Sequence, residues 1–186
     1  MIKTQNSKFK IKNFSAGFSL IEVTVSVMVF SIVMVLVSAI FTRAVELERR
    51  TVWSQRVQEN STLILETIAK EVRVSEVISS NSPTCSATSL IINHPTACNG
   101  SPCNVTYSLS GTNVQRQAGF TSFVNSSDIL VTRFNFCITG TGTNDDESAK
   151  VTILMTVQSL GGSPPVKTNV QTSVISRDIT SELQNL

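Results

Sequence analysis

Four cysteines are the residues of this sequence whose side chains can most readily form covalent or metal bonds. They are Cys85, Cys98, Cys103 and Cys137, and all four lie in the second half of the chain. An even number of cysteines grouped in one region is typical of disulfides formed in an oxidising compartment. A zinc site would need closely paired cysteines or several histidines, whereas His94 is the single histidine. We therefore expect two disulfides, with free thiols and a bound metal as the alternatives.

The residues between two of the cysteines favour one pairing. Positions 99–102, between Cys98 and Cys103, read Asn-Gly-Ser-Pro, and these turn-forming residues could bring the two sulfur atoms together. We therefore expect a Cys98–Cys103 bond, and Cys85–Cys137 follows by elimination. Four cysteines allow three connectivities, so the other two remain open at this point.

Glu22 is the only charged residue in the apolar stretch of residues 18–42. As a helix this stretch is long enough to cross a hydrocarbon core of about 30 Å. A buried helix of a soluble protein is the alternative, but the stretch is apolar on all sides and follows a lysine-rich leader, which favours the membrane. A carboxylate costs up to about 3 kcal/mol at mid-bilayer and is usually paired and functional. The chemistry expected of Glu22 is thus pairing with a cation.

Other polar residues lack the spacing that chemistry would need. The acidic run at 144–147 lacks the alternating ligands of a calcium loop, so we expect a solvated turn, with calcium as the alternative. His94 lies in a polar loop and is expected to be exposed, and Trp53 is expected to pack rather than to bind a ligand. No motif joins Ser, His and Asp into a triad, and no glycine-rich phosphate loop occurs. We therefore predict no enzyme activity, no cofactor and no metal.

One long helix is expected to carry Glu22. No glycine or proline occurs between Phe18 and Ser82, and Pro83 follows. We predict a single helix from residue 18 to about 79, roughly 90 Å long, with an amphipathic second part at residues 43–80. The apolar positions of that second part include Val45, Val52, Leu65, Ile68, Val72, Val77 and Ile78. Such a helix is marginal alone in water, so residues 81–186 must cover its apolar stripe.

Residues 81–186 have the pattern of short strands. Val151, Ile153, Met155 and Val157 alternate with more polar residues, as does a similar run at 134–138. This period-two pattern predicts one antiparallel sheet with one covered face, and hence an α+β fold. The predicted strands are Ser89–Asn93, Val105–Leu109, Asn113–Gln117, Asp128–Ile138, Val151–Ser159 and Asn169–Arg177, with turns at 110–112, 140–147 and 161–165.

Charge is distributed unevenly along the chain. The net charge is +2, and the first seventeen residues hold four lysines and no acid: Lys3, Lys8, Lys10 and Lys12. A basic end before an apolar segment is typical of a terminus that stays on the cytoplasmic side of a single-pass membrane protein. The remaining chain is close to neutral, which disfavours nucleic acid as a partner.

The run Gly17-Phe18-Ser19-Leu20-Ile21-Glu22-Val23 resembles the processing motif of type IV pilins and type II secretion pseudopilins. The resemblance implies that a prepilin peptidase removes the leader, residues 1–17, by cutting between Gly17 and Phe18, and then N-methylates Phe18. It also implies that Glu22 guides assembly with other pilin subunits in the inner membrane and then in a filament, with the β-rich head outside the cytoplasm. The competing explanation is an ordinary secretory signal cut after Ala39, but the apolar run is longer than such signals have.

A looser resemblance concerns the class of pilin. The lack of a helix breaker near Ala39, the several strands after the helix and the final strand at 172–177 resemble a J-type minor pseudopilin or the equivalent minor pilin. This implies a structural subunit at or near the tip of a secretion pseudopilus or a pilus. The alternative is an adhesin or a DNA-capturing pilin. The scattered bases of the head disfavour DNA and leave a sugar-binding face open: Arg116, Arg133, Lys150, Lys167 and Arg177.

Overall fold

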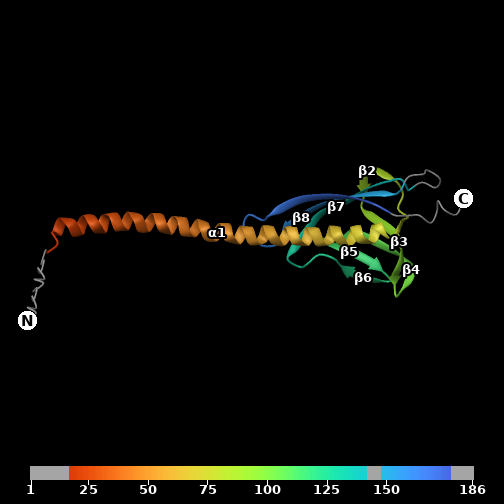
Figure 1. The fold of residues 1–186 in the computed structure, drawn as a ribbon, viewed down its shortest axis with the longest axis horizontal. Helices are drawn as coiled ribbons and strands as arrows, with labels where there is room; N and C mark the ends of the chain where they lie inside the picture. Colours follow the sequence, from red (N-terminus) through yellow and green to blue (C-terminus); the bar gives the residue numbers. More distant parts are fainter. Residues whose placement is uncertain (1–16, 142–147, 177–186) are drawn as a thin grey trace, which may run out of the picture. The chain divides into compact units, whose positions relative to one another are not determined.

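One long helix precedes nine strands in the computed structural model, which describes residues 17–141 and 148–176 (Figure 1). Helix α1 runs from Leu20 to Arg73 without interruption, because no glycine or proline interrupts this part of the sequence. By internal contacts the chain divides into two units, Met1–Glu46 and Leu47–Leu186. The second unit thus includes the C-terminal part of α1 and all of the strands, and we call it the head.

The end of the helix differs from the sequence prediction. Helix α1 ends at Arg73 and not near residue 79, and strand β1 (Glu76–Val77) follows. β1 pairs with β3 (Ser89–Cys98), so that Val77 lies opposite Ile92 and is buried. Val77 therefore gains a place in the core as a strand residue, although its spacing also suits a helix. Pro83, expected to end the helix, instead lies in strand β2 (Ser82–Ala87), and the predicted helical segment 43–80 is too long.

The nine strands form two antiparallel sheets where one was predicted. The first sheet has the order β1-β3-β4-β5-β6, and the second has the order β2-β7-β8-β9. The bounds not yet given are β4 Ser101–Ser110, β5 Asn113–Ala118, β6 Phe120–Phe123, β7 Ile129–Thr139, β8 Lys150–Ser159 and β9 Lys167–Ile175. The α+β class is confirmed, and each of the six predicted strands overlaps an observed one. β1, β2 and β6 were not predicted.

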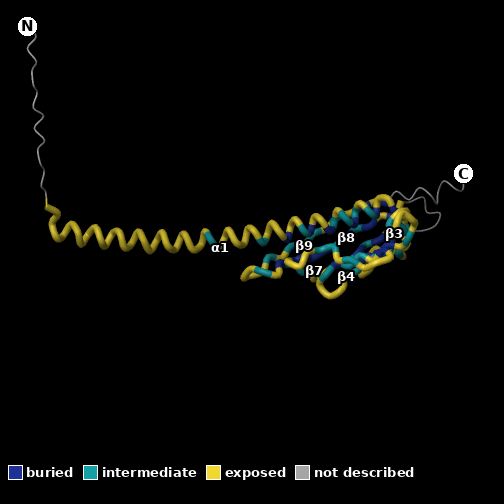
Figure 2. Tube along the Cα trace, turned by 90° about the horizontal axis from the view of Figure 1, so that it is seen from below, coloured by how far each residue is buried: buried dark blue, intermediate teal, exposed yellow. Residues whose placement is uncertain are grey.

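Each sheet has one buried face, as period-two patterning requires. In β8, Val151, Ile153 and Val157 are buried, and their neighbours opposite in β7 include Ile138 and Phe136. The alternation predicted for these two strands is therefore confirmed. Figure 2 shows the buried residues on the inner sides of the strands and on one side of the helix in the head.

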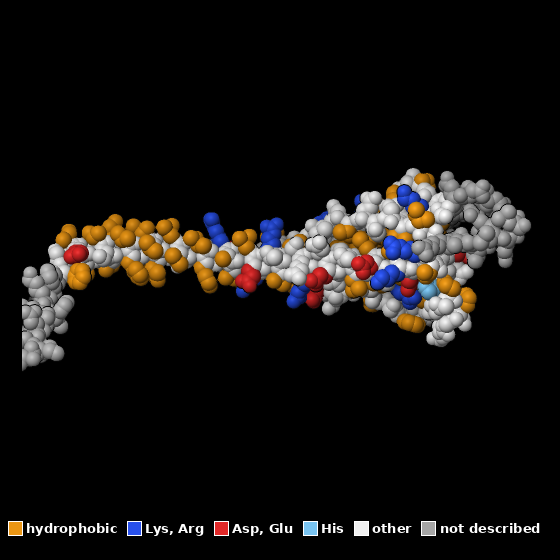
Figure 3. Space-filling view, in the orientation of Figure 1, with side chains coloured by type: hydrophobic (Ala, Val, Ile, Leu, Met, Phe, Trp, Pro, Cys, Tyr) orange, Lys and Arg blue, Asp and Glu red, His pale blue; other side chains and the backbone are white. Residues whose placement is uncertain are grey.

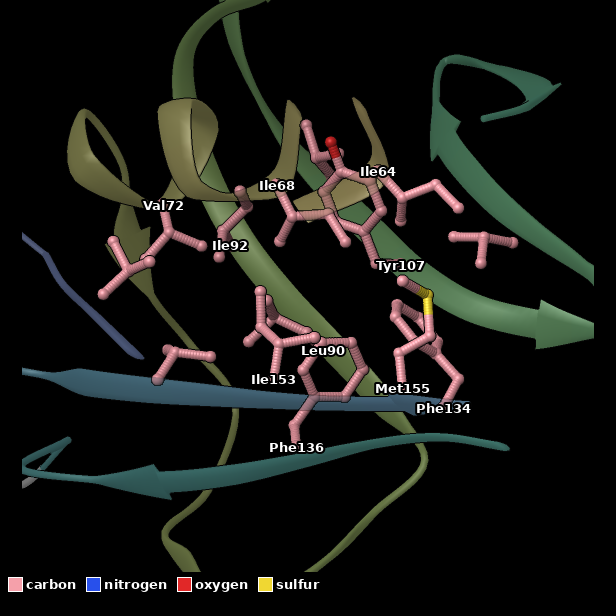
Figure 4. Close-up of a cluster of buried hydrophobic side chains, with 14 of the residues drawn as sticks. Ile64, Ile68, Val72, Leu90, Ile92, Tyr107, Phe134, Phe136, Ile153 and Met155 are labelled. Atoms are coloured by element: carbon pink, nitrogen blue, oxygen red, sulfur yellow. The ribbon is translucent and has the colours of Figure 1, made fainter. Parts of the chain in front are cut away.

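The core of the head joins the helix to both sheets. Val57, Ile64, Ile68 and Val72 supply the buried stripe of α1, at spacings of seven, four and four residues. Figure 4 shows Ile64, Ile68 and Val72 of this stripe facing residues of both sheets: Leu90, Ile92 and Tyr107 of the first, and Phe134, Phe136, Ile153 and Met155 of the second. Two sheets thus cover the apolar stripe of the helix. Of the predicted apolar positions, Ile68, Val72 and Val77 are buried, whereas Val52 and Ile78 are exposed, so the covered stripe is shorter than predicted.

Candidate assembly site

Helix α1 starts within the N-terminal unit in a way that brings Glu22 into the first turn. The carbonyl oxygen of Ser19 accepts hydrogen bonds from the backbone N–H groups of Glu22 at 3.0 Å and Val23 at 3.2 Å. α1 therefore begins at Leu20, with Glu22 in its first turn. The unpaired N–H groups at a helix start favour a negative side chain there. The local backbone thus accommodates the Glu22 carboxylate.

The polar side chains that follow are satisfied inside the helix. Each hydroxyl donates to a backbone carbonyl three or four residues earlier, at distances between 2.7 and 3.2 Å; the donors are Thr24, Ser26, Ser31, Ser38 and Thr42. Side chains bonded in this way leave few polar atoms facing the surroundings. This part of α1 can therefore lie in lipid despite five hydroxyl groups.

The apolar side chains of the same segment cover the helix on all sides. In Figure 3 hydrophobic side chains predominate along the visible face of this part of α1, and none of the residues from Gly17 to Ala44 is buried (Figure 2). Among the described residues, α1 is the one helix whose length and composition suit a membrane crossing. A surface of this kind needs lipid or other apolar helices around it.

The side-chain carboxylate of Glu22 has no hydrogen-bond or ion-pair partner among the described residues, whereas the hydroxyls along the same helix have theirs. The lysines of the leader lie outside the described residues. A carboxylate placed in an apolar surrounding without a partner is costly. The geometry therefore leaves Glu22 available for a cation from outside this helix.

Gly17 shows no structural need for glycine. A Cβ atom added at Gly17 would meet nothing within 4 Å, and Phe18 beside it is 80% exposed. Packing and backbone strain therefore do not explain the glycine at this position. An exposed Gly-Phe junction before a helix is accessible to a processing enzyme.

Within the head, the first sheet is fastened to α1 by a second glutamate that the sequence analysis did not single out. Arg116 of β5 donates to the Glu71 carboxylate through Nη2 at 2.8 Å and Nε at 3.0 Å, and the Tyr107 hydroxyl of β4 donates to it at 2.7 Å. The side chains of Arg116 and Glu71 are only 16% and 18% exposed. No local signal reveals this cluster, because Glu71 precedes its partners by 36 and 45 residues.

The Glu71 cluster shifts the pKa values of its two donors. Burial, and next the hydrogen bond to Glu71, raise the pKa of the Tyr107 hydroxyl far above its ordinary value. Burial opposes the charged form of Arg116, but the hydrogen bond and the negative charge of Glu71 outweigh it and raise the pKa of the guanidinium. Both donors therefore keep their protons, and the cluster serves to hold β4 and β5 against α1.

Two further contacts fasten α1 to other parts of the head. Arg56 pairs with Asp128 at 3.1 Å, and both side chains are about half exposed. Trp53 packs over Gly161, where an added Cβ atom would clash with the indole ring. The prediction that Trp53 is a packing residue agrees with this position.

The four cysteines form the two bonds favoured from the sequence, Cys98–Cys103 and Cys85–Cys137. The first closes the β3–β4 hairpin, whose turn residues Asn99 and Gly100 both have positive φ, at 52° and 84°. Asn-Gly suits a two-residue hairpin turn of this kind. The second joins β2 to β7 within the second sheet. Both bonds are typical of a head that matures in an oxidising compartment.

The remaining candidates from the sequence show no chemistry in the described chain. Residues 17–141 and 148–176 contain no group of three His, Cys, Asp or Glu side chains that could hold a metal. His94 is half-buried rather than exposed, and its Nδ1 accepts a hydrogen bond from the Thr96 N–H at 3.2 Å. His94 thus lies in strand β3, not in the loop expected from the sequence, and its side chain bonds the backbone of the same strand. The acidic run at 144–147 lies outside the described residues.

Comparison with known proteins identifies the N-terminal part of the chain. The family model of the prokaryotic N-terminal methylation motif matches residues 12–38, which include Gly17, Phe18 and Glu22. Comparisons with curated proteins and with solved structures give no match. The motif is accompanied by a single long apolar helix and by two antiparallel sheets packed on its C-terminal part. The chain therefore carries the N-terminal methylation motif that the sequence analysis related to type IV pilins and pseudopilins.

Proposed function

We propose that the chain is a structural minor subunit of a type II secretion pseudopilus or a type IV pilus, at or near the tip, and that it is not an enzyme. The Glu22 carboxylate carries this proposal, because it has no partner among the described residues of an otherwise internally satisfied apolar helix. A prepilin peptidase cuts between Gly17 and Phe18 and methylates the new amine. The mature chain spans the cytoplasmic membrane once, with its N-terminus in the cytoplasm and its head outside, before it enters the filament.

In the proposed filament, Glu22 pairs with the positive N-terminus of Phe18 in a neighbouring subunit. Both groups move from the lipid into a core of apolar helices. Because this core also has a low dielectric constant, both charges remain desolvated there. An ion pair in such a place is costly to break, because removing one partner leaves the other charge desolvated and unpaired. Methylation of the amine keeps its positive charge. The pair therefore favours subunits that are stacked over subunits that remain in the membrane.

The substitution Glu22→Gln tests this mechanism. It keeps the shape and the hydrogen-bonding ability of the side chain and removes the charge. We expect cleavage at Gly17 to continue, while co-purification with partner pilins falls at least tenfold, since the loss of several kcal/mol far exceeds the 1.4 kcal/mol of a tenfold change. The matched control is Ser26→Ala, one turn further on the same face, whose hydroxyl is already bonded within the helix. The control should co-purify as wild type does.

The outcomes separate charge pairing from general damage to the helix. If Glu22→Gln co-purifies with partner pilins as well as Ser26→Ala does, charge pairing is wrong for this subunit. If both variants lose their partners, the helix surface as a whole matters rather than the carboxylate. Cleavage of the wild type and of both variants is followed by measuring the intact mass of the protein in the same samples.

A ligand-capturing or adhesive head is the second candidate function. Its support is the outer face of the second sheet, where β7, β8 and β9 carry cations and no acid in the part of the chain that the structure describes. Exposed Phe120 and Phe123 add less support, because residues three apart in a strand point to opposite faces and do not form one patch.

A further inference from the structure

Among the described residues of β7, β8 and β9, the outer face of the second sheet carries positive charge and no negative charge. β7, β8 and β9 lie side by side in this sheet (Figure 2). The inward residues of β7 and β8 are mostly apolar and buried, and in β9 the inward Val174 is buried, so the alternate residues form the outer face. Three cations stand on this face or at the strand ends, Arg133, Lys150 and Lys167, and no described residue of these three strands is acidic. An uncompensated positive face of this kind favours an anionic ligand.

Arg133 differs from the other arginines that contact the sheets. Arg116 and Arg56 each have a carboxylate partner. Within the described chain, the Arg133 guanidinium contacts no carboxylate, and its Nε donates to Asn135 Oδ1 at 3.4 Å. The terminal nitrogens of Arg133 therefore keep donors in the planar arrangement that suits a carboxylate.

The backbone next to Arg133 is irregular. The pairing register between β7 and β8 shifts between Val131 and Arg133, so that Thr132 is an extra residue in β7. A bulge redirects the side chains that follow it and increases the local twist of the strand. Arg133 thus lies opposite Thr156, in line with Asn169 of β9.

A depression of about 280 Å³ lies beside Arg133. Its polar walls include Thr156, Asn169 and Gln171, and Leu154 adds an apolar patch. The Thr156 hydroxyl donates to Asn169 Oδ1 at 2.8 Å, which fixes the carboxamide and leaves its NH₂ group free to donate. The depression is smaller than pockets that enclose a drug-sized ligand, so it suits one unit of a polymer that lies across the sheet.

These groups match the chemistry of an acidic sugar. A guanidinium binds a carboxylate, and carboxamides and hydroxyls exchange hydrogen bonds with sugar hydroxyls. Single-stranded nucleic acid would instead need aromatic side chains for stacking, and the described outward residues of β7, β8 and β9 include none. We propose that this face binds an acidic polysaccharide, with Arg133 on a uronate carboxylate and with Asn169 and Gln171 on hydroxyls of the same unit.

Calorimetric titration of the full-length protein in a nonionic detergent tests the proposal. The probe is a hexamer of α-1,4-linked galacturonate, and the neutral comparison is maltohexaose. We expect saturable binding of the acidic hexamer only, weakening as salt is raised. Arg133→Gln should weaken binding about tenfold, which corresponds to the loss of one charge-assisted hydrogen bond, and Gln171→Ala should weaken it severalfold. The matched control is Lys70→Gln, which removes one positive charge from an exposed position of α1 and should leave binding unchanged.

Several results would overturn the proposal. One is the absence of saturable binding of the acidic hexamer, and another is equal binding of maltohexaose. A third is equal weakening by Arg133→Gln and Lys70→Gln in folded proteins. If a single-stranded DNA dodecamer binds as tightly and through Arg133, the face is a general polyanion site and the sugar assignment is wrong. Glu22→Gln should not change sugar binding, so this proposal and the assembly proposal can fail separately.

Discussion

The Glu71 cluster allows a sharp test of what holds the first sheet to α1 within the head. Glu71→Gln keeps the size of the side chain but removes the charge that faces Arg116 at 2.8 Å and Tyr107 at 2.7 Å. Breaking a fully buried ion pair costs about 3–5 kcal/mol. Because both side chains keep some exposure, 16% and 18%, we expect the lower end, about 3 kcal/mol.

This loss corresponds to a large shift in thermal unfolding of the head. For a domain of this size, 1 kcal/mol shifts the midpoint by roughly 3–4 °C, so Glu71→Gln should lower it by about 10 °C. The fluorescence of Trp53, the single tryptophan, follows the transition in full-length protein in detergent. The matched control is Glu66→Gln on the same helix, where Lys70 lies 4.0 Å away and both side chains are largely exposed. That pair should contribute less than about 1 kcal/mol.

Two results would refute this reasoning. One is the same midpoint for Glu71→Gln and Glu66→Gln within about 2 °C, since 2 °C is well below the shift worked out above. The other is a double variant, Arg116→Gln with Glu71→Gln, that loses as much stability as the two single variants added together. If the contact is the cause, the double variant should lose clearly less stability than the two single losses added together.

Three further predictions concern the same chain. Tyr107 is the single tyrosine, and its pKa is raised in the folded state. The stability that the protonated Tyr107 hydroxyl contributes is therefore complete below pH about 10 and falls as the pH rises above that value. At about pH 11 the folded protein should show little tyrosinate absorbance and the denatured protein nearly the full amount; equal absorbance would contradict the buried hydrogen bond. Gly161→Ala should destabilise the head by about 1–2 kcal/mol by crowding Trp53, and the loss should largely disappear in a Trp53→Leu background when unfolding is followed by circular dichroism. Intact mass of the membrane-extracted protein should correspond to a chain that begins at methylated Phe18, whereas a start at Met1 or at residue 40 would exclude this processing.

Local patterns predicted the parts of the fold that depend on local physics. The long helix follows from the absence of glycine and proline, and β7 and β8 follow from their alternation of apolar and polar residues. The Asn99-Gly100 turn determines which cysteines meet in the β3–β4 hairpin. In each case the signal lies within a few residues of the element that it predicts.

The missed features depend on contacts between distant parts of the chain. Val77 and Ile78 continue the helical spacing, but Glu76 and Val77 pair with β3, which the local pattern does not reveal. β6 has four residues and β2 contains Pro83, so neither resembles an ordinary strand. The division into two sheets is likewise set by pairing across the chain, because both sheets satisfy the same alternation.

Two glutamates of one helix show how the surroundings of a carboxylate determine its role. Glu71 has an arginine and a tyrosine within hydrogen-bond distance inside its own chain, so its charge stabilises the fold. Glu22 lies in an apolar segment whose hydroxyls are bonded to the helix backbone, and it has no partner among the described residues. Since an apolar surrounding makes an unpaired carboxylate costly, the partner that lowers this cost must come from elsewhere. Removing Glu71 should therefore change the unfolding of a single subunit, whereas removing Glu22 should change only how subunits associate.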